Sequence, residues 1–251
     1  MKIKQILVII FCLLGVSFCY SQEINTVTIS GKATDFDGNP IDSCIVQVLR
    51  SDFTSAYETY TDKNGEYAID GVEKGKYVAL YAIRPKEYPK EDAVPDDEKR
   101  LEFWAWNVIA NEDLTINPRY HKLELYGVNA FMVEGGYQGL IIYVRPMSLQ
   151  KYLSCFKDKS VSEKETDISV KPKYFEVKVF MDELPLVVNS TQPVTEYVGK
   201  DDLHITGYLI QVDLPKNKQD KSYCILRIEA LNKEYNEKGE SLYFYKMPNY
   251  K

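Results

Sequence analysis

Hydrophobic and polar residues alternate along much of this chain, a pattern typical of β-strands with one buried face. From Val27 to Asp35 every second residue is apolar or small until the run ends. Residues 37–40 (Asp-Gly-Asn-Pro) stop this strand, because Asp, Gly and Asn adopt turn dihedrals and proline has no N–H to donate. The same pattern predicts strands at 44–49, 56–61, 66–69 and 77–83, with glycine-containing turns at 62–65 and 71–75.

A charged, proline-containing segment interrupts this pattern. Residues 85–100 hold three prolines and ten charged residues in sixteen positions, which leaves too few apolar side chains to bury a surface. We expect a linker or a long surface loop here. Beyond it, β-patterned runs are expected at 103–109, 123–133, 140–144, 174–181, 184–188, 205–214, 223–231 and 242–245, with a charged exposed loop at 157–173.

One helix is predicted in the second part of the chain. Leu149, Tyr152, Leu153 and Phe156 follow the i, i+3, i+4, i+7 spacing of an amphipathic helix, and Ser148 before them is a helix start signal. The predicted fold class is therefore all-β. It comprises an N-terminal β-sandwich at residues 25–84, a linker at 85–100 and, at 101–251, a larger and mainly antiparallel β domain with one short helix.

The turn residues of the first part form an ordered series. This series is Gly31-x-Ala33-x-Asp35-x-x-Gly38-x-Pro40, the small Cys44 with Val46, Asp62-x-x-Gly65-x-Tyr67 and Gly75-x-Tyr77. It resembles the carboxypeptidase regulatory-like domain over about residues 25–84, a third of the chain. The resemblance implies a transthyretin-like β-sandwich, an accessory role without peptidase activity, and an exported protein of a Bacteroidetes-type bacterium. The remaining two thirds resemble no family that we recognise.

The N-terminus has the pattern of a secretory signal. Lys2 and Lys4 precede an apolar run from Ile6 to Phe18, and we expect cleavage after Ser21. A lipid anchor at Cys19 is the less favoured alternative, because the residue before such a cysteine is normally small. No later stretch approaches the ~18 apolar residues of a membrane span. The expected location is the periplasm or the cell surface, with the side of the outer membrane left open.

Charge and cysteine content narrow the set of partners. The formal net charge is −6, and loss of two lysines with the signal makes it −8. No basic stripe is present to release counterions from nucleic acid, so nucleic acid is not an expected partner. Cys44, Cys155 and Cys224 are odd in number and lack a CxxC spacing, which argues against a disulfide scaffold. We expect buried thiols, with one disulfide among the three as the alternative.

Few residues suggest catalysis or a cofactor. His121 and His204 have no His or Cys at metal-ligand spacing, and no GxSxG or P-loop motif occurs. Asp35 and Asp62 lie in segments shorter than a calcium loop, so we assign them to turns. No metal, cofactor or enzymatic activity is therefore expected. A hydrolase that uses either histidine beside a carboxylate is the least favoured alternative.

Aromatic residues and one arginine are the candidate contact residues. Trp104 and Trp106 are two apart and share one face of a strand, while Tyr126 and Tyr137 lie in the neighbouring predicted hairpin. Aromatic faces stack on sugar rings, but aromatic residues two apart on a strand also pack in ordinary cores. Arg145, at a strand end, suits an acidic ligand or a loop carboxylate.

These features predict an exported, non-catalytic binding or accessory protein of the bacterial cell envelope, with a glycan as one possible ligand. The alternative is a structural or assembly protein that engages another envelope protein through an exposed strand edge or an apolar patch.

Overall fold

The computed structural model describes residues 25–91, 93–136, 138–157, 167–197, 199, 204–215 and 222–247. Strands dominate these residues, and they contain one α-helix, α2 (Leu149–Lys157), so the predicted all-β class with one short helix is confirmed. No helix within the described ranges is long and apolar enough to cross a membrane. The predicted signal and Cys19 lie outside the described residues.

The first part of the chain forms nine strands. They are β1 (Thr26–Lys32), β2 (Ile45–Leu49), β3 (Ser55–Tyr60), β4 (Glu66–Glu73), β5 (Gly75–Lys76), β6 (Ala79–Ile83), β7 (Phe103–Trp106), β8 (Ile109–Ala110) and β9 (Leu114–Thr115). The expected strand at 103–109 is divided, because Asn107 takes a positive φ of 54° and turns the chain.

The second part adds eight longer strands. They are β10 (Leu123–Phe131), β11 (Gly139–Ser148), β12 (Phe175–Met181), β13 (Leu184–Pro185), β14 (Val188–Tyr197), β15 (His204–Asp213), β16 (Tyr223–Asn232) and β17 (Glu237–Lys246). The expected run at 184–188 is divided between β13 and the first residue of β14, and β17 begins five residues before its predicted start. Polar residues in both strands break the alternation on which the prediction depends.

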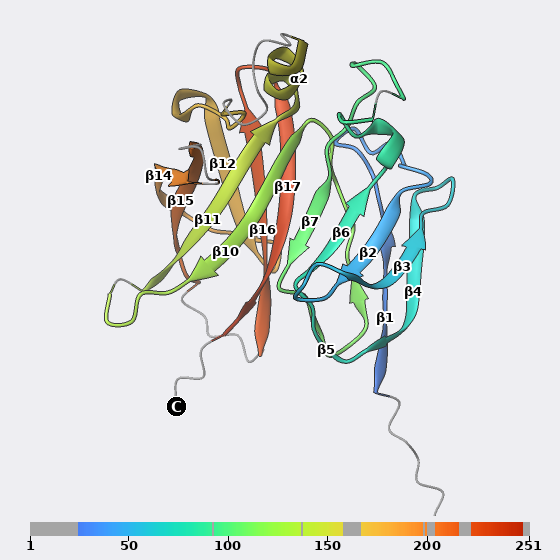
Figure 1. The fold of residues 1–251 in the computed structure, drawn as a ribbon. Helices are drawn as coiled ribbons and strands as arrows, with labels where there is room; N and C mark the ends of the chain where they lie inside the picture. Colours follow the sequence, from blue (N-terminus) through green and yellow to red (C-terminus); the bar gives the residue numbers. More distant parts are fainter. Residues whose placement is uncertain are drawn as a thin grey trace, which may run out of the picture.

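One eight-stranded sheet runs through both parts of the chain. Its order is β13-β12-β16-β17-β7-β6-β2-β3, and it is antiparallel except for the parallel pair β17 and β7. A three-stranded sheet, β4-β1-β9, covers one face of its N-terminal half. A four-stranded sheet, β10-β11-β15-β14, covers the opposite face of its C-terminal half. Figure 1 shows β10 and β11 in front of β16 and β17, with β7 and β6 beside them.

The first sandwich depends on a close approach between β1 and the segment after β9. A Cβ on Gly31 would overlap the carbonyl oxygen of Ile116, so only glycine fits. The Tyr67 hydroxyl donates to that same carbonyl at 2.7 Å. Both residues belong to the ordered turn series. The resemblance to the carboxypeptidase regulatory-like domain remains a prediction. The two contacts show what Gly31 and Tyr67 do in this fold.

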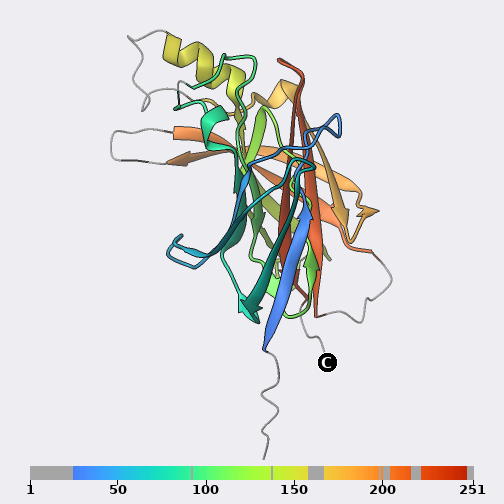
Figure 2. The ribbon, with the colours of Figure 1, turned by 90° about the vertical axis from the view of Figure 1, so that its right-hand side faces the viewer.

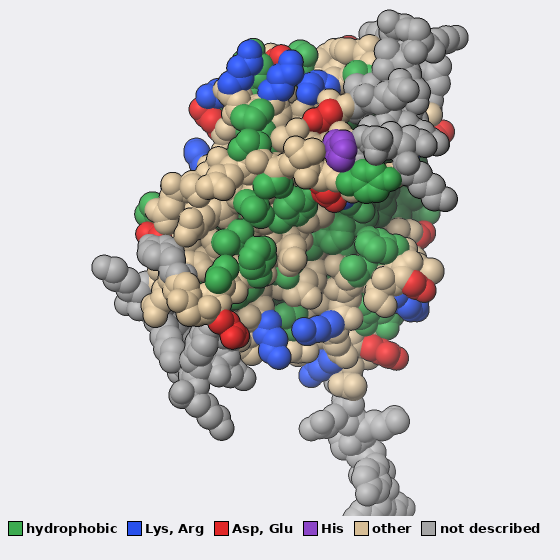
Figure 3. Space-filling model, turned by 60° about the vertical axis from the view of Figure 1, so that its left-hand side comes forward, with side chains coloured by type: hydrophobic (Ala, Val, Ile, Leu, Met, Phe, Trp, Pro, Cys, Tyr) green, Lys and Arg blue, Asp and Glu red, His purple; other side chains and the backbone are tan. Residues whose placement is uncertain are grey.

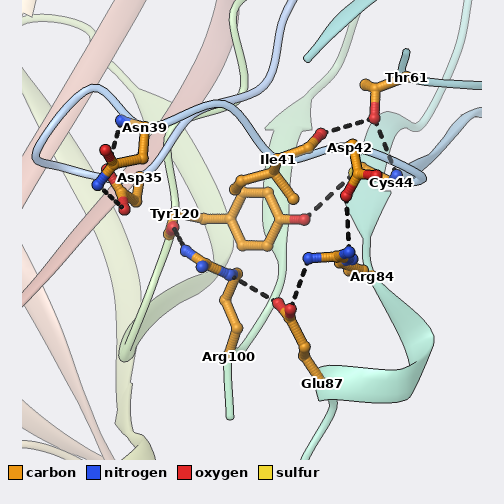
Figure 4. Close-up of polar contacts among 10 residues, drawn as sticks. All are labelled: Asp35, Asn39, Ile41, Asp42, Cys44, Thr61, Arg84, Glu87, Arg100 and Tyr120. Carbon is orange, nitrogen blue, oxygen red and sulfur yellow. Dashed lines mark hydrogen bonds and ion pairs between the residues drawn. The ribbon is translucent and has the colours of Figure 1, made fainter. Parts of the chain in front are cut away.

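Residues 85–100 connect β6 to β7, which are neighbours in the large sheet. Glu87 holds this segment at both ends (Figure 4). Its carboxylate accepts hydrogen bonds from Arg84 at 2.7 Å and from Arg100 at 3.0 Å, and Glu87 is only 8% exposed. The segment predicted as a linker therefore lies between two paired strands of one sheet.

The same segment also touches the helix. Leu101 packs against Leu149 and Leu153 of α2, and Tyr88 joins this cluster. The backbone N–H of Lys151 donates to the Ser148 hydroxyl, which caps the helix as its sequence predicted.

Candidate functional site

The candidate site begins with β7, a strand that is buried on both faces. All four of its residues are buried. Phe103 and Ala105 belong to the core under the three-stranded sheet, and Trp104 and Trp106 belong to the core under the four-stranded sheet. A strand between two layers has no polar face, which is why the sequence Phe-Trp-Ala-Trp does not alternate. The two indoles stack with ring centroids 4.7 Å apart and an interplanar angle of 13°. Each tryptophan residue is 7% exposed, so together they offer little surface to a ligand.

Tyr126 of β10 connects the tryptophan pair to the outer face of the four-stranded sheet. Its ring meets both indoles edge to face, at 5.3 Å from Trp104 and 5.2 Å from Trp106. The Arg145 guanidinium lies over the same tyrosine ring, 4.8 Å from its centroid. Arg145 and Tyr126 are cross-strand partners, so they share the outer face of this sheet. Half-buried Tyr126 thus separates buried indoles from a partly exposed cation.

Two carboxyl groups, buried Glu124 and half-buried Glu102, adjoin this cluster. The Trp104 Nε1–H lies 3.1 Å from carboxyl oxygens of both Glu102 and Glu124. The carboxyls of Glu102 and Glu124 hydrogen-bond each other, which requires a proton between them. Desolvation by burial raises the pKa of both groups, most strongly at Glu124, which is 2% exposed. The Tyr81 hydroxyl donates to Glu102 at 2.7 Å and completes the network.

A second row of polar contacts crosses the outer face of the four-stranded sheet. The Tyr143 hydroxyl donates to Glu196 of β14, and its ring lies across Gly207 of β15, where a Cβ would come within 2.6 Å of the hydroxyl. Glu196 also faces Arg145, with Nε and Oε2 3.7 Å apart. At that separation the pair is a loose ion pair and not a hydrogen bond. The row therefore joins β11 to the edge strand β14 across β15.

Two N–H donors at this site have no hydrogen-bond partner. Only four buried side-chain N or O atoms in the described ranges are unpaired, and two of them are Trp106 Nε1 and Arg145 Nε. Both side chains contact the Tyr126 ring. A buried donor without an acceptor costs about 1–3 kcal/mol, so a folded protein rarely keeps one without a reason. Two around a single ring suit a ligand that is rich in acceptors.

The structure brings four of the five predicted contact residues together. Trp104, Trp106, Tyr126 and Arg145 form one continuous cluster, while Tyr137 lies outside the described residues. Sequence reasoning missed the other members of the site, namely Tyr81, Glu102, Glu124, Tyr143 and Glu196. Glu124 alternates with the apolar Leu123 and Leu125, so the sequence pattern indicated a solvent-facing position and gave no signal of its burial. No sequence signal pointed to Glu196, because it comes to Arg145 only through strand pairing.

The histidines lie apart from any described carboxylate partner. Burial lowers the pKa of His121 to about 4, and His204 is exposed beside Tyr197, with ring centroids 5.7 Å apart. Neither imidazole forms a hydrogen bond or ion pair with a carboxylate among the residues that the structure describes. This arrangement gives the hydrolase alternative no support.

The cysteines and the acidic turns take structural places. Cys44, Cys155 and Cys224 form no disulfide; Cys44 and Cys224 are buried as expected, and Cys155 is half-buried. Asp35 accepts backbone hydrogen bonds from residues 37 and 39, and Asp62 from residues 64 and 66, so both act in turns. No group of three His, Cys, Asp or Glu residues suited to a metal occurs within the described part of the chain.

Comparisons with known proteins place few limits on the function. No protein-family model matches the chain, and a search of curated proteins finds no match. Among solved structures, a candidate carbohydrate-binding protein of Bacteroides uniformis is 13% identical, with a TM-score of 0.28, over 88% of this chain and 99% of that one. The major pilin BcpA of Bacillus cereus has the same identity and TM-score, over 88% and 68%. The major pilin SpaD of Corynebacterium diphtheriae is 10% identical, with a TM-score of 0.24, over 87% and 64%. Likeness this distant carries no argument about this chain.

Proposed function

We propose that this chain is an exported, non-catalytic binding protein of the cell envelope that takes a carbohydrate at the cluster around Tyr126. Export is inferred from the N-terminal signal pattern, and the accessory role from the resemblance of residues 25–84. The observation that carries the proposal is the pair of unpaired donors, Trp106 Nε1 and Arg145 Nε, on either side of one aromatic ring. A sugar matches such a site in two ways. Its hydroxyl groups accept hydrogen bonds from the unpaired donors, and its C–H faces stack on the aromatic ring.

The burial of the tryptophans decides how such a site would work. A flat platform would expose its indoles, and these are almost covered. We therefore assign Trp104 to packing and to its two carboxyl partners. Trp106 and Tyr126 form the inner wall of the site, and Arg145 forms its partly exposed rim, with a side chain that is 19% exposed. Ligand reaches the inner donors when the side chains at the rim move aside.

A glycan array followed by calorimetry tests this function. Trp106→Phe keeps an aromatic ring in the core and removes the unpaired N–H, so it should lower sugar affinity. The smaller ring also leaves a cavity, so the stability of the variant is measured beside its affinity. Tyr235→Ala removes an exposed aromatic ring in the turn between β16 and β17 and is the matched control. Absence of binding to every glycan on the array would refute a carbohydrate function. Equal affinity of Trp106→Phe and wild type would refute the site.

The alternative is an assembly protein, and the edge strand β14 favours it. Among the described strands, this ten-residue strand pairs only with β15, and the two stand out from the body of the sheets (Figure 2). Leu184 and Val187, which precede it, are 53% and 62% exposed. Hydrophobic side chains also gather across the middle of the face in Figure 3. An unpaired edge beside apolar surface is a template for a strand of another envelope protein.

One substitution separates the two functions. Thr191→Lys places a charge on the exposed edge strand and should abolish strand addition while leaving Arg145 and Tyr126 unchanged. Loss of sugar binding in this variant would argue against the carbohydrate site. Retention of sugar binding would separate the site from the edge.

A further inference from the structure

Arg145 is partly desolvated and only loosely paired. Its side chain is 19% exposed, and burial lowers its pKa. In the described part of the chain, its one ion pair is the contact with Glu196, which is 3.7 Å long. A guanidinium has five N–H donors in a planar fork, and this fork matches the two oxygens of a carboxylate. The protein has therefore removed water from this arginine without supplying a matching anion.

The nearest acidic groups do not neutralise it. Glu124 and Glu102 share a proton between them, so the pair carries at most one negative charge. That charge already receives hydrogen bonds from Tyr81 and Trp104. The aromatic ring of Tyr126 lies against the guanidinium and holds it in place through a cation–π contact. Arg145 is thus held against this ring with its buried Nε–H unpaired.

Glu196 occupies the place where an incoming anion would bind. It is half-exposed on the edge strand β14 and is held by the Tyr143 hydroxyl. Exposed ion pairs of this length contribute little, so a better-placed carboxylate would displace it. Desolvation raises the pKa of Glu196, which further weakens its hold on the arginine.

We propose that the site selects a sugar that bears a single carboxylate, which Arg145 receives while the sugar ring rests against the Tyr126 wall. This inference rests on the proposed carbohydrate function and names its ligand class. A single carboxylate is favoured over a polyanionic chain, because the protein carries a net charge of −6 and the cluster around Tyr126 contains one cation, Arg145. Glu196 acts as an internal competitor that the acidic sugar replaces.

Calorimetry with matched sugars tests the selection. The probes are glucuronate- and galacturonate-terminated disaccharides, each beside its carboxyl-reduced counterpart. We expect the acidic member of a pair to bind at least about tenfold more tightly, the effect of a charge-assisted hydrogen-bond pair. Arg145→Gln should reduce this ratio to near one. Glu196→Gln should increase the affinity for the acidic sugar by about twofold to fivefold, since it removes the competitor.

The control removes the same charge elsewhere. Glu183→Gln alters an exposed carboxylate that pairs with Arg227 and should leave both affinities as they are. Equal binding of acidic and neutral sugars would overturn this inference and leave the carbohydrate function standing. Binding of neither sugar would defeat both. Equally tight binding of an acetylated glutamyl peptide would overturn the assignment to sugars. Should Arg145→Gln fail to fold, the ratio in wild type and its rise in Glu196→Gln decide the question.

Discussion

Replacing Glu124 by glutamine tests the proton that this residue shares with Glu102. The new amide has the shape of a protonated carboxyl, so it can accept from the Trp104 N–H and donate to Glu102. Glu102 then keeps three donors and no longer has a carboxyl as its neighbour. The substitution therefore removes a titration from the core while keeping its hydrogen bonds.

The direction of the pH effect follows from the raised pKa values. In the unfolded chain both carboxyls lose their protons near the ordinary pKa of 4.5. The folded protein retains a proton on the pair above that pH, so stability is greatest at low pH and falls as the pH rises towards the raised pKa. One retained proton costs about 1.4 kcal/mol in free energy of unfolding for each pH unit. As the pH rises from 5 towards that raised pKa, the wild type should lose stability from this pair, and Glu124→Gln should not.

Denaturant unfolding at several pH values is the assay. The difference in free energy of unfolding between Glu124→Gln and wild type should grow with pH, in favour of the variant, with the slope given above. Glu66→Gln on the surface of β4 is the control and should show no such slope. Parallel curves for Glu124→Gln and wild type would refute a shared proton and would mean that both carboxyls ionise normally in the folded protein.

Three further predictions concern the first part of the chain. Gly31→Ala should prevent folding or lower the melting temperature sharply, because its Cβ would overlap the backbone at Ile116; a wild-type melting curve would contradict this close approach. Tyr67→Phe should lower the free energy of unfolding by about 1 kcal/mol, since it leaves that buried carbonyl without its donor; urea unfolding measures the change, and no change would mean that water replaces the hydroxyl. Glu87→Ala should make residues 85–100 a site of rapid limited proteolysis, because it releases both arginine contacts; unchanged cleavage would mean that packing against α2 alone holds the segment.

The alternation of apolar and polar residues predicted most strands, but it could not predict how the sheets are layered on one another. Period-two alternation identifies a strand with one buried face, as in β16, whose residues alternate between buried and half-buried. It says nothing about a strand that is covered on both sides, and β7 is such a strand. The parallel pairing of β7 with β17 joins residues more than a hundred positions apart, and no local signal marks it.

The charged segment at 85–100 shows a related limit. Composition alone predicts exposure, because ten charged residues in sixteen cannot all be buried. One buried glutamate between two arginines nevertheless fixes this segment, and one tyrosine and one leucine attach it to the helix cluster. Average composition therefore misses a segment whose structure depends on three or four particular side chains.

The residues of the candidate site could be predicted only in part, because residue type can be read from the sequence and strand pairing cannot. Four of its residues were selected by chemical type, as aromatic residues of neighbouring predicted strands and an arginine at a predicted strand end, and the structure brings these four together. Their partners are carboxylates from three different strands or connections, and only the sheet pairing brings these near. Glu196 lies fifty-one positions from Arg145 in the sequence, and the link between them runs across β15.

The tryptophans can be buried and still take part in the proposed site, because packing involves their ring faces and the proposed binding involves the Trp106 N–H. Packing accounts for the ring faces of Trp104 and Trp106, which contact each other and Tyr126. Packing does not account for the Trp106 N–H, since an apolar group at that position of the ring would pack without leaving a donor unpaired. The neighbouring Trp104 satisfies its own N–H with two carboxyls, so this environment can supply acceptors where the fold alone requires them. The unpaired donor beside Arg145 is therefore better explained by an acceptor that arrives from outside the chain.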